Sequence, residues 1–344
     1  MEQQDILSMT LPELQAAVQK LGEPKFRAKQ IFNWLHQKRV TDFSEMTTLS
    51  LPFRERLASD FCINRLKIAK RLASSVDDTV KYLYELPDGN YVETVCMQYH
   101  HGTSLCISTQ VGCRMGCRFC ASAIAGFVRN LTPAEMLLQI YETERAQNCK
   151  ISSLVLMGIG EPLDNFDNVL RFLQLLSDPN GYGMSLRHVT VSTCGVVPKI
   201  LELAEQRLGL TLSVSLHCPN DAGRSAIMPI NRSYPIDVLL DACQTYFEKT
   251  GRRVTFEYAV MEQVNSAEQD AAALAERLKG LHAHVNLIPI NPVKERNFHT
   301  LKKTVLQFQK TLERYGIPAT IRRTLGSDIE AACGQLRRDA IQQT

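Results

Sequence analysis

The chain has 344 residues, of which 44% are hydrophobic and 22% charged, and its formal net charge is +3. This composition is typical of a water-soluble globular protein with one large and one small domain. A net charge this small is not enough by itself to attract nucleic acid, so a nucleic-acid partner would have to bind a local basic patch. No apolar run approaches the roughly 18–20 residues of a membrane span.

The N-terminus and the cysteines indicate the cellular compartment. Met1 to Asp5 are not a basic region followed by an apolar stretch, so no signal peptide is visible. The eleven cysteines are an odd number in a chain too long to need disulfide staples. We therefore expect a cytoplasmic monomer without a membrane partner, in which cysteines serve metal binding or catalysis.

Residues 1–60 are predicted to form a small helical accessory domain. One amphipathic segment begins at Leu11, a second covers Phe26 to Gln37, and Gly22-Glu23-Pro24-Lys25 is the turn between them. Basic residues gather in this domain, namely Lys25, Arg27, Lys29, Lys38 and Arg39. Such a run is about as often a solvated helix face as a surface that contacts RNA, so both interpretations stay open.

Residues 61–100 are predicted to be a β-rich extension that leads to the next domain. Two strand-like stretches, 82–86 and 91–95, flank Pro87-Asp88-Gly89-Asn90, which is a strong tight-turn signal. His100-His101-Gly102 interrupts the β pattern. We therefore expect a domain boundary near residue 100.

Residues 101–325 alternate short apolar strands with amphipathic helices. The predicted strands are 104–109, 153–157, 188–193, 210–216, 253–260, 283–288 and 319–323. The predicted helices are 133–147, 165–176, 197–206, 235–249, 266–279 and 301–315, and Thr132-Pro133-Ala134-Glu135 begins the first of them with a capping box. This alternation predicts an α/β fold with a parallel sheet closed or partly closed as a barrel. Six βα units fall short of the eight of a full barrel, and residues 326–344 remain as a C-terminal segment.

The run Cys113-Arg114-Met115-Gly116-Cys117-Arg118-Phe119-Cys120 places three thiols within eight residues. Thiolates are the ligands that soft iron prefers, and three of them would leave one iron of a four-iron cluster with an open coordination site. The alternative is a structural zinc site with Cys106 or Cys149 as fourth ligand. Because neither residue belongs to a second CxxC, the spacing favours the iron–sulfur cluster.

Polar or glycine-rich stretches follow four of the predicted strands. They are Met157–Pro162, Val191–Gly195, Ser213–His217 and Pro289–Pro292. Glycines let a backbone approach a ligand closely, and the carboxylate of Glu161 can receive an ammonium group. Since functional groups gather at the carboxyl ends of barrel strands, these stretches and the cysteine run predict one cofactor pocket.

The spacing CxxxCxxC, with an aromatic residue before the last cysteine, resembles the signature of radical S-adenosylmethionine (SAM) enzymes. With the motifs at 22–28 and 328–336, nearly the whole chain is similar to the RlmN/Cfr family of RNA methyltransferases. The resemblance implies a partial (βα)6 TIM-like radical SAM barrel with a small α+β N-terminal accessory domain. It also implies a [4Fe-4S] cluster held by Cys113, Cys117 and Cys120, and SAM bound by Gly160, Glu161, Ser192, Ser215, Leu216, His217 and Asn291.

The same resemblance implies methylation of adenine carbon 2 by way of protein sulfur, with two SAM molecules per turnover. One SAM would methylate Cys333, and the second, cleaved at the cluster, would yield a radical that takes a hydrogen from that methyl group. The carbon radical would add to adenine, Glu93 would act as general base, and Cys106 would attack Cys333 to release the product and leave a transient disulfide. The other cysteines match no family role and are expected to be packing or surface residues, namely Cys62, Cys96, Cys149, Cys194, Cys218 and Cys243.

The implied substrates are 23S ribosomal RNA, at adenosine 2503 of the peptidyl transferase centre, and adenosine 37 of some transfer RNAs. An external electron donor such as flavodoxin is implied as well. Arginines near the reactive cysteine, namely Arg322, Arg323, Arg337 and Arg338, could contact phosphates, and the target base would have to leave its stack. Two alternatives stay open: a Cfr-type enzyme that methylates carbon 8, which the proline after Glu161 disfavours, and an RNA-binding protein with a purely structural metal site.

Overall fold

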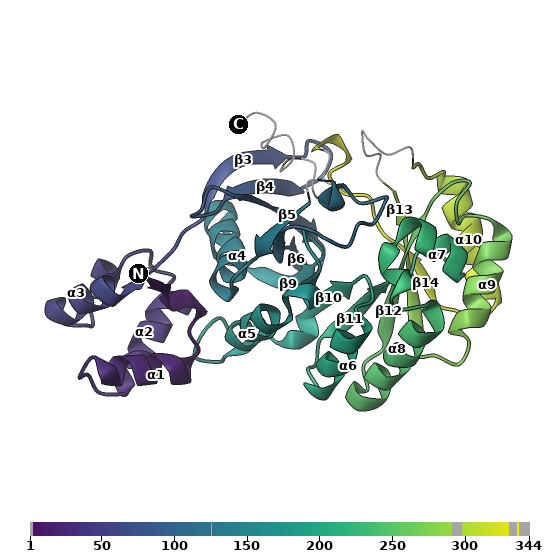
Figure 1. The fold of residues 1–344 in the computed structure, drawn as a ribbon. Helices are drawn as coiled ribbons and strands as arrows, with labels where there is room; N and C mark the ends of the chain where they lie inside the picture. The colour runs from purple at the N-terminus through teal and green to yellow at the C-terminus, as the bar shows by residue number, and fades with distance from the viewer. Residues whose placement is uncertain (1–2, 125, 291–297, 330–335, 337–344) are drawn as a thin grey trace.

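The computed structural model of the chain describes residues 3–124, 126–290, 298–329 and 336. Figure 1 shows two parts, a group of short helices that carries the N-terminus and a larger body built on one sheet. The smaller part contains α1 (Leu11–Lys20), α2 (Phe26–His36) and α3 (Leu51–Asp60). A short parallel pair, β1 (Gln4–Asp5) with β2 (Phe61–Cys62), joins its two ends. The helices predicted for residues 1–60 are therefore confirmed.

The larger body is a ten-stranded sheet with the order β14-β13-β12-β11-β10-β9-β6-β5-β4-β3. Its parallel strands are β6 (Gly102–Cys106), β9 (Ile151–Leu156), β10 (Val189–Thr193), β11 (Thr211–Ser215), β12 (Val254–Val260), β13 (Ala283–Pro289) and β14 (Ala319–Ile321). Helices separate them: α4 (Pro133–Gln147), α5 (Phe166–Ser177), α6 (Val197–Glu205), α7 (Asp221–Ile227), α8 (Ile236–Thr250), α9 (Glu268–Leu278) and α10 (Lys302–Arg314). The predicted partial (βα)6 barrel is confirmed, with ends that differ by a few residues.

The antiparallel end of the sheet consists of β3 (Lys67–Ala73), β4 (Val80–Glu85) and β5 (Tyr91–Tyr99). The predicted turn joins β4 to β5, where the backbone N–H of Leu86 donates to Asn90 at 2.8 Å. β5 then pairs with β6 from Tyr99, opposite Gly102, to Val95. The expected boundary near residue 100 thus coincides with a turn inside one continuous sheet.

Three elements of the larger body were not predicted. β7 (Gln110–Gly112) pairs with β8 (Phe127–Asn130) and so brackets the cysteine run, and α7 follows β11. Strands of three and four residues are too short to show an alternating pattern. Gly112 is required in this hairpin, because its φ is +80° and an added Cβ would lie 1.7 Å from the carbonyl oxygen of Gly126.

Helix α4 joins the two parts of the molecule. It begins with the predicted capping box, in which Thr132 accepts from the backbone of Glu135, and its first turns are buried on all sides. On the side of the N-terminal helices, Tyr141 lies 2.9 Å from the Nδ1 atom of the fully buried His36. A helix enclosed in this way fixes the small part against the sheet.

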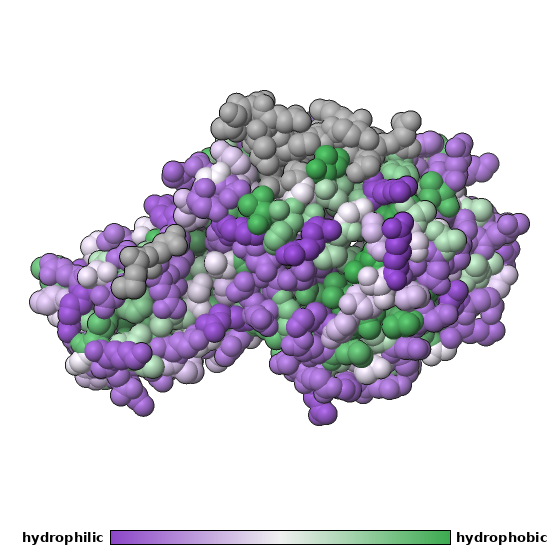
Figure 2. Space-filling model, viewed as in Figure 1, coloured by the Kyte–Doolittle hydropathy of each residue, from purple (hydrophilic) through white to green (hydrophobic). Residues whose placement is uncertain are grey.

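Among the described residues, none of the helices is long and apolar enough to cross a membrane. Figure 2 shows that hydrophilic residues cover most of the face in view, with hydrophobic ones in small groups between them.

Candidate active site

A cavity of about 350 Å³ opens at the carboxyl ends of the parallel strands. The last residues of five strands line it: Cys106, Leu156, Thr193, Ser215 and Pro289. A cavity of this volume is in the range of small-molecule sites. Its place is the one where enzymes of barrel architecture bind their substrates.

The cysteine run forms one side of this cavity. Cys113, Cys117 and Cys120 all line it. The loop that carries them is tied at both ends, since Cys113 donates its backbone N–H to Gly126 at 3.2 Å and Arg118 donates its own to Ile227 at 2.9 Å. The structure therefore brings the three predicted metal ligands to one wall.

The donor set fits an iron–sulfur cluster better than a single metal ion. Burial raises the pKa of the Cys113 thiol to about 12 and that of Cys117 above its ordinary value, and metal binding would displace these protons. In the described part of the chain, no three His, Cys, Asp or Glu side chains converge on a single ion. A cubane bonds each cysteine to a different iron, so its thiols need not meet at one point.

Glu161 is buried and lines the cavity. Its carboxylate accepts backbone N–H groups of Cys194 at 2.7 Å and Leu163 at 3.0 Å. Burial raises the pKa of this carboxyl group, and the hydrogen bonds from Cys194 and Thr193 oppose the rise. These donors carry no net charge, so an ammonium group could add a charge-assisted hydrogen bond to the carboxyl group.

His217 presents a neutral imidazole to the cavity. Its Nδ1 accepts the backbone N–H of Ala259 at 2.9 Å, so the ring proton lies on Nε2. Burial, and then the charge of Arg224, lowers the pKa of His217 to about 3. The ring stands edge-on to Phe119 of the cysteine run, with centroids 4.7 Å apart. His217 can therefore donate one hydrogen bond to a ligand across the physiological pH range.

The remaining residues predicted to bind SAM divide into three groups. Gly160, Ser192 and Ser215 line the cavity. Leu216 does not, because its side chain is fully buried in the hydrophobic core. Its backbone carbonyl accepts a hydrogen bond from Nε of Arg224 at 3.2 Å. Asn291 lies outside the described residues.

Of the three residues with predicted catalytic roles, the structure places one in the cavity. Cys106, at the end of β6, lines it and packs with Val95, Met97 and Leu325. Glu93 does not line it, although alternation along β5 puts it on the same face as Val95 and Met97. Glu93 is buried and forms an ion pair with Lys81 at 2.9 Å. Cys333 lies outside the described residues.

Sequence reasoning did not single out several residues of the site. Glu257 of β12 lines the cavity, where its carboxylate accepts Ser213 Oγ at 2.6 Å and Asn286 Nδ2 at 2.8 Å. Polar residues at alternating positions of three neighbouring strands were the available signal. Cys194 also lines the cavity.

A buried arginine holds the strand ends in place. The guanidinium of Arg224 is fully buried and donates to the carbonyls of Cys194, Ser215 and Leu216. Its position in the short helix α7 gave no signal, since an arginine in a polar stretch is ordinarily exposed.

Comparison with known proteins agrees with this geometry. Residues 4–63 match the ribosomal RNA large subunit methyltransferase N-terminal domain, and residues 107–275 match the radical SAM superfamily. A probable dual-specificity RNA methyltransferase RlmN of Lachnoclostridium phytofermentans is 50% identical over 347 aligned positions, which cover 100% of this chain and 97% of that protein. Its counterpart in Clostridium novyi is 48% identical over 98% of this chain and 99% of its own length.

A solved structure extends the similarity to the whole fold. The crystal structure of a radical SAM methyltransferase from Sphaerobacter thermophilus superposes with a TM-score of 0.92 at 40% identity, over 96% of this chain and 98% of that one. Full-length identity near one half and a shared fold leave no room for a purely structural metal protein as the family. The chain belongs to the RlmN family of radical SAM RNA methyltransferases.

Proposed function

We propose that this protein methylates carbon 2 of adenine in RNA through a methyl group carried on Cys333. The observation that carries the proposal is that Cys106 of β6 lines the same cavity as the three cysteines of the run. A [4Fe-4S] cluster that keeps one iron open for SAM takes three cysteine ligands, so Cys106 is not required as a fourth. A methyl carrier that must be released from its product needs a second thiol nearby.

The walls of the cavity are suited to holding SAM. When bound by Cys113, Cys117 and Cys120, a [4Fe-4S] cluster supplies the electron that cleaves SAM reductively. Glu161 would receive the ammonium group of SAM, and Nε2–H of His217 would donate to one of its acceptors. The apolar side chains of Met115 and Phe119 line the cavity beside them, and they would keep water away from a reactive carbon.

The protein's own thiols and a carboxylate would carry out the methyl transfer. A first SAM methylates the thiolate of Cys333, and a second is consumed when a hydrogen atom is removed from that methyl group. The carbon on the Cys333 sulfur then adds to carbon 2 of adenine. The adduct radical gives up one electron, for which the oxidised cluster would be the acceptor, and Glu93 removes the ring proton. Cys106 then attacks the sulfur of Cys333, the carbon–sulfur bond breaks, and the departing methylene carbon takes up a proton, which frees the methylated base and leaves a disulfide.

The proposed substrates are 23S ribosomal RNA at adenosine 2503 and transfer RNA at adenosine 37. Arg322 and Arg323 line the cavity and would contact phosphates beside an adenine that has left its stack. We further propose that the enzyme acts as a monomer in the cytoplasm with a flavodoxin-like electron donor.

The test uses anaerobically purified, reduced holoenzyme with SAM and a fragment of 23S ribosomal RNA. We expect wild-type protein to form 2-methyladenosine, the Cys106→Ala protein to accumulate a covalent protein–RNA adduct, and the Cys333→Ala protein to form neither. Cys62→Ser is the control, because Cys62 lies in β2 outside the cavity. Mass spectrometry distinguishes the products.

Two results would overturn the proposal. Formation of 8-methyladenosine alone would assign the protein to the Cfr type. An adduct in the Cys333→Ala protein would remove that residue from the role of methyl carrier.

A further inference from the structure

Gln110, in the hairpin that brackets the cysteine run, is fully buried and lies outside the cavity lining. Its Oε1 accepts the backbone N–H of Glu161 at 2.8 Å. Its Nε2 donates to Asn130 Oδ1 at 2.8 Å and to Asp164 Oδ2 at 2.7 Å. One side chain thus joins β7, β8 and the turn that carries Glu161.

The same carboxylate of Asp164 reaches the cysteine run itself. Arg114, the residue after Cys113, places its Nε 2.9 Å from Asp164 Oδ2. The guanidinium of Arg114 also stacks over the ring of Phe127 in β8, 3.9 Å from its centroid. Asp164 therefore stands between the cysteine run on one side and Gln110 on the other.

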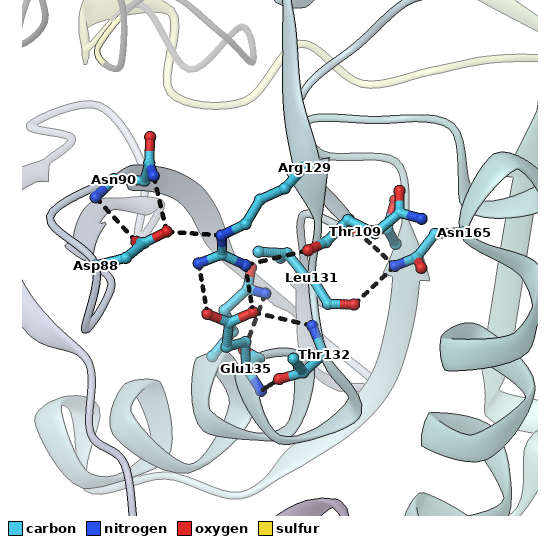
Figure 3. A network of polar contacts seen from close by, with 10 residues as sticks. Asp88, Asn90, Thr109, Arg129, Leu131, Thr132, Glu135 and Asn165 are labelled. Carbon is cyan, nitrogen blue, oxygen red and sulfur yellow. Dashed lines mark hydrogen bonds and ion pairs between the residues drawn. The ribbon is translucent and has the colours of Figure 1, made fainter. Parts of the chain in front are cut away.

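A second link runs parallel to the first. Asn165 Nδ2 donates to the carbonyls of Thr109 and Leu131, each at 2.8 Å, as Figure 3 shows. These two residues flank the hairpin in sequence, one just before β7 and the other just after β8. The Glu161–Asn165 segment is thus attached to the hairpin at both ends.

The backbone at Gly160 packs directly against the Gln110 side chain, with no space for a side chain of its own. Its φ is +108°, and a Cβ added there would lie 2.6 Å from Cβ of Gln110. The backbone before Glu161 is therefore pressed against the Gln110 side chain, and a change in the shape of either would displace the Glu161 carboxylate.

We propose that Gln110 is a positioning residue for SAM, because it sets the distance between the cysteine run and the Glu161 carboxylate. The inference rests on the proposed function, in which the amino and carboxylate groups of one SAM molecule meet the cluster and an N–H of the same amino group donates to Glu161. A ligand held at two points loses affinity when the points are displaced by a fraction of an ångström. Gln110 fixes both points at once and touches neither the ligand nor the metal.

The molecule offers a matched control for this residue. Gln139 of α4 is also fully buried, and its amide is equally occupied, with Ser108 N–H and Thr94 Oγ donating to Oε1 and Nε2 donating to the Ser108 carbonyl. It makes none of its hydrogen bonds to Glu161, Asp164 or the hairpin strands. Loss of a buried amide can thus be compared with loss of this particular one.

The experiment compares Gln110→Met with Gln139→Met in the anaerobic holoenzyme. Methionine keeps the volume of glutamine and removes its hydrogen bonds. We expect both variants to unfold at lower urea concentration and to keep the wild-type iron content. SAM binding, measured by equilibrium dialysis, should weaken about tenfold in Gln110→Met and less than twofold in Gln139→Met.

If Gln110→Met does not fold, Asp164→Asn replaces it in the experiment. Asp164 is partly exposed, so this variant should fold, and the loss of its charge breaks the ion pair with Arg114. We expect a two- to threefold loss of SAM affinity in that variant. If Gln110→Met and Asp164→Asn both bound SAM as tightly as wild type, the role of Gln110 would be overturned and the proposed function would stand. Loss of iron together with affinity would also overturn it, since Gln110 would then support the cluster loop. A wild-type holoenzyme that binds no SAM would overturn the proposed function as well.

Discussion

Two regions of the sheet each bury a glutamate, and they stabilise it in different ways. At the carboxyl ends of the parallel strands, Glu161 accepts only uncharged donors, the backbone N–H groups of Leu163 and Cys194. In the antiparallel extension, Glu93 is paired with the fully buried ammonium of Lys81. The first carboxyl group has no cationic side chain among these donors, and the second is paired with an ammonium group.

The difference separates a binding group from a group that needs its partner to stay folded. A carboxylate without a cationic partner attracts a cationic ligand and gains little from its neighbours. A buried ion pair gains from mutual attraction, but either member alone carries the full cost of burial. Changes in the two regions should therefore affect different measurements.

The largest effect is expected from breaking the ion pair. Lys81→Met leaves Glu93 buried without its partner, so the free energy of unfolding should fall by roughly 3–5 kcal/mol. Urea unfolding followed by circular dichroism measures this. Adding Glu93→Leu should restore most of the stability, since two apolar side chains replace the pair. A single variant as stable as wild type would show that the ion pair is dispensable for folding.

The next effect concerns the carboxyl group of Glu161. Glu161→Gln removes the charge that would meet the ammonium group of SAM, so affinity should fall about tenfold to a hundredfold, as for loss of a charge-assisted hydrogen bond. Equilibrium dialysis of the anaerobic holoenzyme measures it, with iron content as control. If Glu161→Gln bound SAM as tightly as wild type, the carboxylate would not be the ammonium receptor.

The smallest effect concerns a link between the two regions. Arg129 of β8 donates to Asp88 in the β4–β5 turn and to Glu135 in the first turn of α4, as Figure 3 shows. The hydrogen bond from Arg129 lowers the pKa of Asp88 to about 2. Since the Asp88 side chain is 39% exposed, Asp88→Asn should cost less than about 1 kcal/mol at neutral pH.

The pH dependence of this variant has a definite sign. A carboxyl group with a lowered pKa stabilises the fold above its unfolded value of 3.8, and this contribution disappears as pH falls from there to about 2. The difference in urea midpoint between wild type and Asp88→Asn should therefore narrow from about pH 5 to about pH 3. A constant difference over that range would mean that the charge of Asp88 is unimportant to the link.

Much of the fold could be predicted because its local patterns are strong. The helix at Pro133 carries a proline and a capping box, and its predicted limits agree with α4. The β4–β5 turn was visible in Pro87-Asp88-Gly89-Asn90. The β7–β8 hairpin and α7 could not be predicted, since elements so short form only when the chain around them packs.

Some features of the candidate site could likewise be predicted from the sequence, and others could not. Spacing alone identified Cys113, Cys117 and Cys120, since three thiols in eight residues have few other uses. The amino-acid sequence could not show that Glu93 is buried against Lys81, because the two residues meet only when β4 and β5 pair. It also could not show that Leu216 points into the core.

The sequence by itself determined the alternation of strands and helices, the cysteine run and the family, because each of these depends on residues close together in the chain. The tertiary structure decided which side chains face the cavity and which partners they have. Gln110 meets Glu161 across 51 positions of the chain, and the order of the strands, rather than any local pattern, brings them within hydrogen-bonding distance. Burial then gives each contact its strength, because removal of water turns a weak polar contact into one whose loss is costly.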